Sequence, residues 1–277
     1  YLLAQLEIEL ANGQKLTVAS DGSWVATKEG PVRSSDTLDG EVYDARREMP
    51  GWDAPGFDAQ AWQPVEVLPE LKARLVAQPN EPIRVVEELK PVALHEPKPG
   101  VWVFDMGQNM VGWCRLQLSG SPGTTVTLRH AEMTNADGTI YTANLRGAPE
   151  VDRYTLRGGR AETFEPHFTY HGFRFVEVTG LAEKPKLTAL YGRVFCSASP
   201  EVSRFTCSNP MLNRLWQNIR WTQRANLMSV PTDCPQRDER QGWLGDRSEE
   251  CRGESYLFDI SKLYAKWLQD ISDSQRD

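Results

Sequence analysis

The stretch 231-PTDCPQRDERQGWLGDRSEE-250 is the most unusual part of the sequence. Its twenty positions hold six Asp and Glu residues, three arginines, one cysteine and one tryptophan. A charge-dense connection between helices is most often a solvated loop. Tryptophan and cysteine prefer burial, however, and the glycines indicate a backbone that makes tight, specific turns. The stretch is therefore a candidate site as well as a connection.

The hydrophobic period changes at about residue 207, shortly before this stretch. Ser208 is expected to cap a helix with Pro210 in its first turn, and Pro231 is expected to end it. Trp221 lies on the face opposite the apolar stripe, so a second element is expected to cover it. Another helix is expected within 256–275. Residues with helical spacing are Leu212, Leu215, Trp216, Ile219 and Leu227 in the first segment, and Leu263, Trp267, Leu268 and Ile271 in the second.

The first two thirds of the chain have the pattern of short β-strands, at 6–10, 15–20, 101–106, 113–120 and 124–130. Turn signals separate them, namely Asn12-Gly13, Asp21-Gly22, Pro122-Gly123, Asp137-Gly138 and Gly158-Gly159. Frequent short strands without intervening helices predict antiparallel β-sandwiches.

The predicted fold is multidomain, with jelly-roll-like β-sandwich modules followed by helices. The predicted boundaries are 1–72 for the first module, 73–195 for the second and 196–277 for the start of an all-helical domain. The proline-bearing segment 78–100 marks the break between the modules. The span 41–67, with its tryptophans and glycines, is expected to be an irregular loop at the end of the first module.

Composition excludes several classes of partner. The 277 residues include 31 basic and 38 acidic side chains, for a net charge of −7 without any basic run, which argues against nucleic acid and anionic membranes. No apolar run reaches the roughly 18 residues of a membrane helix. The five cysteines favour free thiols, although Cys196 and Cys207 could pair in an oxidising compartment. Oligomeric state and compartment stay open.

Most other chemical motifs are absent. Gly107 and Gly112 lack the setting of a dinucleotide-binding turn, and His167 and His171 have no third metal ligand nearby in sequence. Cys234 has no histidine within sixty residues, which argues against a nucleophilic thiol. No pattern predicts a cofactor or a metal ion, calcium included.

The opening stretch instead suits acid–base work on glycosides. Glycoside hydrolysis needs one protonated carboxylic acid and a second carboxylate. Apolar neighbours such as Trp243 and Pro235 would keep an acid neutral, whereas Arg237 and Arg240 would act in the opposite direction. The sequence leaves open which carboxyl carries the proton. The candidates are Asp233, Asp238, Glu239, Asp246, Glu249 and Glu250.

The run 233-DCPQRDERQGWLGD-246 resembles the signature of bacterial α-L-rhamnosidases of glycoside hydrolase family 78, where it begins an (α/α)6 barrel. Upstream, 40–62 resembles the end of that family's N-terminal β-sandwich, and 105–120, 129–159 and 169–180 resemble its concanavalin-like sandwich. The resemblance implies removal of terminal α-L-rhamnose from glycosides or polysaccharides, with inversion at the anomeric carbon.

By motif position, the resemblance makes Glu239 the general acid. Asp233 and Asp246 would bind the hydroxyls of the sugar and hold Glu239 partly protonated, while Arg237, Asp238 and Trp243 would line the pocket. The general base would be a glutamate beyond residue 277, so this chain, which opens without Met and stops inside helical sequence, is expected to be an inactive piece of a longer enzyme.

The polar segment 247–255 departs from the mostly apolar helix of many relatives, which weakens the expectation for rhamnose more than for glycosidase activity. Two alternatives remain. The β-modules could form a carbohydrate-binding protein without catalysis, or the enzyme could act on another sugar. A lyase is disfavoured because the helical part has no histidine to serve as base.

Overall fold

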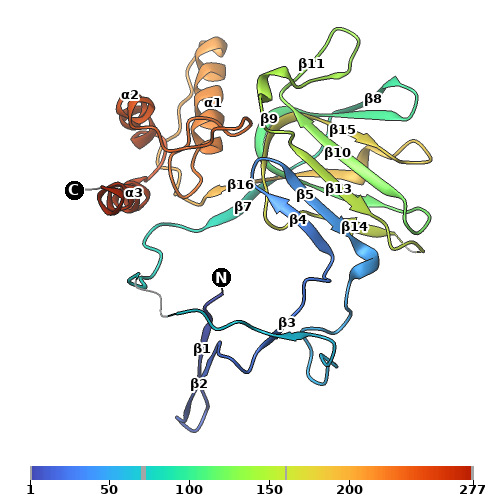
Figure 1. Ribbon diagram of the computed structural model, residues 1–277. Coiled ribbons are helices and arrows are strands. Elements are labelled where there is room, and N and C mark those ends of the chain that lie inside the picture. Colours follow the sequence, from blue (N-terminus) through green and yellow to red (C-terminus); the bar gives the residue numbers. More distant parts are fainter. Residues whose placement is uncertain (1, 70–72, 160, 276–277) are drawn as a thin grey trace. The chain divides into compact units, whose positions relative to one another are not determined.

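The computed structural model describes residues 2–69, 73–159 and 161–275 (Figure 1). The chain forms two compact units, residues 1–31 with 47–76 and residues 32–46 with 77–277. In the first unit, β1 (Gln5–Glu9) and β2 (Lys15–Ala19) form an antiparallel hairpin, and β3 (Val25–Ala26) pairs with β6 (Gln63–Pro64). The hairpin turns at the predicted Asn12-Gly13, where Gly13 has the positive φ of +80° that favours glycine.

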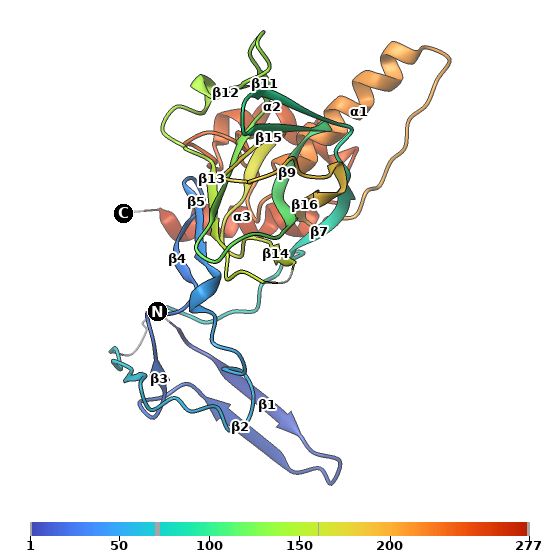
Figure 2. The ribbon, with the colours of Figure 1, turned by 90° about the vertical axis from the view of Figure 1, so that its right-hand side faces the viewer.

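The second unit is built on a curled ten-stranded sheet (Figures 1 and 2). Its path is β4-β5-β13-β10-β15-β9-β16-β7, and β8 and β14 also pair with β9. All pairs are antiparallel except β5 with β13. The strands are β4 (Val32–Asp36), β5 (Gly40–Asp44), β7 (Ile83–Leu89), β8 (Ala93–Lys98), β9 (Val101–Leu118), β10 (Thr125–Ala131), β13 (Val151–Thr155), β14 (Glu162–Phe164), β15 (His171–Thr179) and β16 (Leu190–Ser197).

The central strand β9 runs continuously for 18 residues, where the sequence predicts two strands, 101–106 and 113–120. Glycine makes this continuity possible. At Gly112 the φ is +145°, and a Cβ would lie 1.9 Å from the carbonyl oxygen of Arg193. Because β9 pairs with four neighbours, its apolar side chains lie in the main core with those of the other strands. The largest are Phe104, Met110, Leu116, Leu128, Phe164, Phe173 and Leu190.

The N-terminal segment contributes two strands to this sheet. Residues 40–44 form β5, beside β13, although the sequence analysis expects an irregular loop over 41–67. Both β4 and β5 lie in the second unit, within the range predicted for the first module. Short elements complete the unit, namely η1 (Ala45–Arg47) at its edge, β11 (Met133–Thr134), β12 (Ile140–Tyr141), η2 (Ala143–Leu145) and η3 (Leu187–Ala189).

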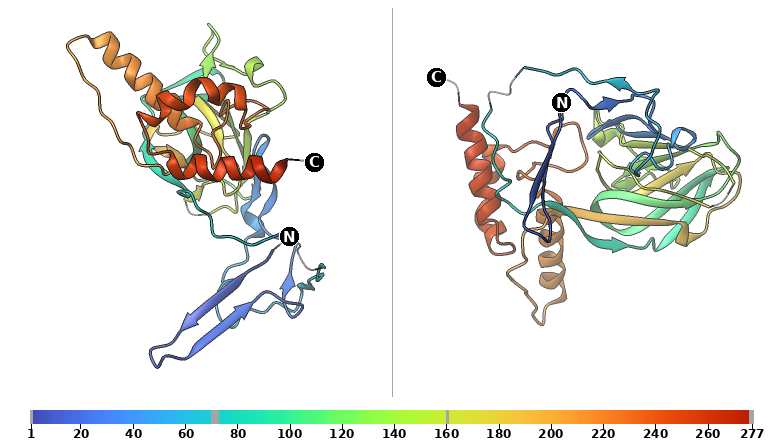
Figure 3. Two further views of the ribbon diagram at one scale, coloured as in Figure 1. Left: turned by 90° about the vertical axis from the view of Figure 1, so that its left-hand side faces the viewer. Right: turned by 90° about the horizontal axis from the view of Figure 1, so that it is seen from below.

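Three helices lie together beside the curled sheet (Figures 1 and 3). Helix α1 (Pro210–Ala225) is capped by the side chain of Asn209, which accepts from the Met211 N–H, so the predicted cap at Ser208 is wrong by one residue. The helix ends at Ala225, well before Pro231, because Asn226 turns the chain. Among the described residues, no helix combines the length and apolar character of a membrane-spanning segment.

The faces of α1 that are buried and exposed differ from the prediction. Leu212, Leu215 and Ile219 of the apolar stripe are exposed, whereas Trp221 packs against the core of the sheet. Trp216 packs into a second core formed with residues near α3. The sheet is thus the element that covers Trp221.

Helix α3 (Ser261–Ser274) lies within the predicted range, but α2 (Leu244–Ser255) falls where the sequence analysis expects a polar connection. This helix tolerates its charges because two of them are buried together. Arg247 lies 3.5 Å from Glu254 and hydrogen-bonds the carbonyl of Thr232. Gly253 lies inside the helix with open space around it. The helix therefore continues through Gly253.

Candidate active site

The stretch 231–243 forms a closed loop between α1 and α2. Two contacts between Asp233 and Gln241 close it, with the Asp233 N–H donating to the Gln241 carbonyl at 3.0 Å and the Gln241 N–H donating to Asp233 Oδ1 at 2.9 Å. The seven residues between them are consequently held in one compact turn, which contains Arg237, Asp238 and Glu239.

Both carboxylate oxygens of Glu239 accept N–H donors. Trp243 Nε1 donates to Oε1 at 2.9 Å, while Arg237 Nε and Arg146 Nη2 donate to Oε2 at 3.0 and 2.9 Å. The Glu239 side chain is 23% exposed, so it is open to a ligand on one side. These donors fix the direction of the carboxylate and leave a limited approach to it.

Asp233 is the most buried carboxylate of the group, with a side chain only 2% exposed. Arg237 Nη2 lies 3.3 Å from Asp233 Oδ2 and so joins this carboxylate to Glu239. A single guanidinium therefore links two of the predicted site residues.

Asp238 faces the sandwich. Arg146 Nε donates to its Oδ1 at 2.6 Å, and the Gly147 N–H donates to its Oδ2 at 3.1 Å. Burial acts to raise the pKa of Asp238, but the hydrogen bonds from Arg146 and Gly147 outweigh it and lower the pKa. Asp238 is therefore ionised, and its visible contacts are with the sandwich.

Direct contacts join four of the six predicted site residues, Asp233, Arg237, Glu239 and Trp243, whereas Asp238 is linked to Glu239 through Arg146. Trp243 is 46% exposed and contacts Glu239 through its indole N–H. Asp246 lies exposed in the first turn of α2, and among the described residues it forms no hydrogen bond or ion pair with the other five. The loop alone thus does not bring Asp246 into the cluster.

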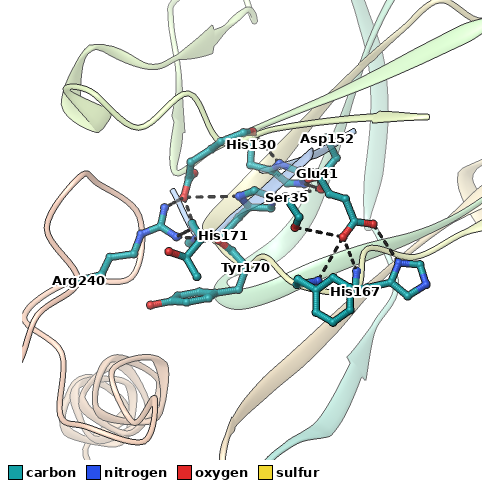
Figure 4. Close-up of polar contacts among 12 residues, drawn as sticks. Ser35, Glu41, His130, Asp152, His167, Tyr170, His171 and Arg240 are labelled. Carbon is teal, nitrogen blue, oxygen red and sulfur yellow. Dashed lines mark hydrogen bonds and ion pairs between the residues drawn. The ribbon is translucent and has the colours of Figure 1, made fainter. Parts of the chain in front are cut away.

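Arg240 ties this loop to the sheet (Figure 4). Its side chain is 3% exposed, and all five of its N–H donors are used. Nε donates to the Arg237 carbonyl and Nη2 to the Gln236 carbonyl, both within the loop. Across from the loop, Nη1 donates to the carbonyls of Thr37 and Tyr170, and Nη2 lies 2.6 Å from Glu150 Oε1. The guanidinium also lies over the Tyr170 ring, 4.9 Å from its centroid.

Behind Glu150 lies a buried polar cluster. His130 and His171 stack with ring centroids 4.0 Å apart, and His171 Nε2 lies 3.0 Å from Asp152 Oδ2. Burial, together with the neighbouring His171, lowers the pKa of His130 to about 3, so this imidazole is neutral. Burial raises the pKa of Glu150, against the opposing effect of Arg240. The cluster is an internal support for the loop, because no side chain in it reaches solvent.

The same sheet edge holds Glu41, whose buried carboxylate accepts from Ser35 Oγ and from the N–H groups of His167 and Phe168 (Figure 4). His167 Nδ1 also lies 2.9 Å from Glu41 Oε1. The two histidines paired in the sequence analysis therefore belong to different contacts, His167 to Glu41 and His171 to Asp152.

In the part of the chain that the structure describes, two groups have donor atoms close enough to hold a metal ion, namely His130, Asp152 and His171, and Asp233, Cys234 and Glu239. The two imidazole rings are stacked in nearly parallel planes, so the lone pairs of their nitrogens do not point toward one common position. The ligands of a tetrahedral metal ion do point toward one position. In the second group the Arg237 guanidinium occupies the carboxylate oxygens, and burial raises the pKa of the Cys234 thiol. Neither arrangement fits a metal centre.

A cleft of about 520 Å³ lies between α1 and the sheet. Trp221 lines it, but Arg224 stacks on the indole at 3.9 Å, which favours packing over a sugar platform. Its polar lining includes Gln108, Asn109, Glu132, Arg174, Arg214 and Asn218.

Sequence reasoning missed the sandwich residues of the site. Arg146 lies 92 and 93 residues before its partners Asp238 and Glu239, so no local pattern connects them. The only available signal was the segment 129–159, which the family resemblance already included. The sequence around Arg240 indicates only its charge, because its anchoring partners Thr37 and Glu150 lie 203 and 90 residues away in the chain.

Comparison with known proteins gives three family models in chain order. Residues 1–87 match the α-L-rhamnosidase N-terminal domain, 95–196 the bacterial α-L-rhamnosidase concanavalin-like domain, and 200–277 the bacterial α-L-rhamnosidase six-hairpin glycosidase domain. These matches confirm the predicted fold class of sandwich modules followed by barrel helices. The boundaries at 72 and 195 stay a prediction.

Individual relatives agree with the family models. An α-L-rhamnosidase from Streptomyces avermitilis, whose structure is known in complex with L-rhamnose, is 50% identical, with a TM-score of 0.96. An α-L-rhamnosidase structure from Dictyoglumus thermophilum is 38% identical, also with a TM-score of 0.96. A family 78 rhamnosidase from Bacillus sp. GL1 is 27% identical over 59% of this chain and 17% of its own, with a TM-score of 0.50. The first two matches cover 99% of this chain but only 27% and 31% of theirs.

Proposed function

Because the chain belongs to the bacterial α-L-rhamnosidases of glycoside hydrolase family 78, we propose that the protein removes terminal α-L-rhamnose from glycosides or polysaccharides. The observation that carries the proposal is the arrangement around Glu239. Its carboxylate is oriented by three N–H donors and remains 23% exposed beside Trp243.

Glu239 is the general acid in this proposal. It gives its proton to the glycosidic oxygen as the bond to the anomeric carbon breaks, and an attacking water inverts that carbon. Asp233 and Asp246 bind sugar hydroxyls, while Arg237, Asp238 and Trp243 line the pocket. Asp246 must then meet the sugar from α2, since among the described residues it forms no hydrogen bond or ion pair with the other five.

The general base belongs to another part of the whole protein. An inverting enzyme holds its two carboxyl groups roughly 6.5 to 9.5 Å apart so that water fits between them. The chain spans about 27% of the length of the Streptomyces relative, and residues 1–277 alone are therefore proposed to be inactive. Release of rhamnose by residues 1–277 on their own would contradict this.

The direct test uses the complete protein with a panel of aryl glycosides. Glu239→Gln should lower kcat/KM on phenyl α-L-rhamnoside, whose leaving group requires protonation, by about 10²- to 10⁴-fold, the usual contribution of a general acid. Glu249→Gln is the matched control, because Glu249 is an exposed glutamate on α2, and it should leave activity unchanged. Full activity in Glu239→Gln would refute the assignment of Glu239 as the general acid. Preference for another glycoside would refute L-rhamnose as the sugar that is removed.

The same measurements distinguish the glycosidase from the alternative of a carbohydrate-binding protein. A carbohydrate-binding protein without catalysis would bind L-rhamnose and release no product from any member of the panel. Isothermal titration with L-rhamnose, run beside the activity assay, gives that comparison.

A further inference from the structure

We propose that Arg146, a residue of the sandwich, is a positioning residue for the general acid of the barrel. The inference rests on the proposed function of Glu239. Arg146 lies between η2 and β13 and spans two carboxylates, with Nε 2.6 Å from Asp238 Oδ1 and Nη2 2.9 Å from Glu239 Oε2. The side chain is 51% exposed, so it lies at the open side of the acid.

The backbone holds Arg146 in an unfavourable conformation. Its φ is +55°, in the left-handed region that ordinary side chains avoid. Among the described residues, three of the four non-glycine residues with positive φ, Arg146, Glu150 and Arg240, belong to the junction between sandwich and loop. Such strain persists where the surrounding contacts fix the conformation, and it concentrates at functional sites.

Close packing of Gly147 against Asp238 also holds the Asp238 carboxylate in place. The Gly147 N–H donates to Asp238 Oδ2, and a Cβ at Gly147 would lie 2.7 Å from that oxygen. Asp238 is thereby clamped by two successive sandwich residues. Because Glu239 follows Asp238 directly, the clamp and the Arg146 guanidinium together set where the acid points.

The chemistry gives Arg146 a further effect through Glu239. When the Glu239 carboxylic acid transfers its proton to the glycosidic oxygen, the bond from that oxygen to the anomeric carbon breaks and a neutral alcohol leaves. The acid becomes a carboxylate, and water adds to the anomeric carbon while the base takes its proton. Guanidiniums already placed at Oε2 stabilise the negative charge as it develops.

This role predicts a dependence on the leaving group. An alkoxide or sugar leaving group requires protonation, whereas 2,4-dinitrophenolate leaves without it. Loss of Arg146 should therefore harm the first kind of substrate and spare the second. A purely structural defect would lower activity on both kinds equally.

The experiment measures kcat and KM of the complete protein on a rhamnose-containing disaccharide and on 2,4-dinitrophenyl α-L-rhamnoside. Arg146→Gln should lower kcat/KM for the disaccharide by about 10- to 100-fold, mainly through kcat, with a change below about threefold for the dinitrophenyl substrate. Arg146→Gly removes the side chain at a φ that glycine adopts freely, so it keeps the test valid if Arg146→Gln folds poorly. Arg129→Gln, which breaks the Arg129–Glu177 pair on the same sandwich, is the matched control and should change neither substrate.

Equal losses on the two substrates, or no loss on either, would overturn the role of Arg146. Glu239→Gln is run beside these variants. If it shows the leaving-group dependence and the Arg146 variants do not, only the inference on Arg146 fails. If Glu239→Gln itself lacks the dependence, the acid assignment fails, and the role of Arg146 fails with it.

Discussion

The ion pair between Arg240 and Glu150 should be a main determinant of stability at the junction. Its side chains are 3% and 0% exposed, and Nη2 lies 2.6 Å from Oε1. Glu150→Gln keeps the shape and one acceptor but leaves Arg240 without its counter-charge. Removing one partner of a buried pair costs about 3 to 5 kcal/mol. We expect the lower end, about 3 kcal/mol, for this substitution.

Arg240→Met should cost more. It removes the charge partner of Glu150, and it also leaves the Thr37, Tyr170 and Gln236 carbonyls without their shared donor. Each of the three carbonyls that loses its donor adds about 1 kcal/mol to the roughly 3 kcal/mol for the broken ion pair, so the total is about 6 kcal/mol. The double variant should fall short of the sum by about 2 kcal/mol, since neither single charge is then left buried.

Urea unfolding, followed by tryptophan fluorescence and by circular dichroism, measures these differences. The more exposed Arg129–Glu177 pair is the matched control, and its disruption should cost at most about 1 kcal/mol. A Glu150→Gln variant within about 0.5 kcal/mol of the parent, with additive single and double variants, would refute the reasoning.

Three further predictions follow from the same unit. The pKa of His130 is held at about 3 in the folded state against 6.5 unfolded, so between these values only the unfolded chain takes up the proton. The contribution of His130 to stability therefore falls as pH drops. The free energy of unfolding of the parent, relative to that of His130→Phe, should decline by about 2 kcal/mol from pH 6.5 to 5. Glu150 is present in both proteins, so its titration cancels in this comparison. Gly172→Ala would place a Cβ 2.9 Å from the Pro235 backbone and should cost about 1 to 3 kcal/mol, whereas Gly245→Ala meets open space; equal unfolding free energies for the two variants would contradict this. All five cysteines are free, so the pairing considered for Cys196 and Cys207 is wrong; a thiol reagent should label the partly exposed Cys207 and Cys251 quickly and the buried Cys114, Cys196 and Cys234 only after unfolding.

Much of the fold could be predicted from sequence because its signals are local. Alternating strands and turn residues such as Asn12-Gly13 depend on near neighbours, and so does the helical spacing around α3. Helix α2 could not be predicted because a segment with so many charges is typical of a solvated loop. The burial of Arg247 beside Glu254 comes from the tertiary fold, which no local pattern displays.

For the site, too, residues close together in sequence could be predicted and distant ones could not. The cluster of Asp233, Arg237 and Glu239 could be located because the three lie within seven residues of chain, and the family resemblance gave their expected roles. The contribution of Arg146 depends on a β-sheet that returns a segment some ninety residues distant to the loop. A contact of that separation requires the folded chain, whatever the strength of each local signal.

The distribution of donors on Arg240 also limits how domains of this family can be exchanged between relatives. Its five N–H groups are shared between carbonyls of the loop and acceptors of the sheet, so the loop and the sheet edge form one structural unit. A chimera that joins the sandwich of one relative to the barrel of another must keep the Glu150 carboxylate and the backbone course that presents the carbonyls of residues 37 and 170 to the incoming arginine. A crossover placed by domain boundary alone would separate the loop from the partners that shape it.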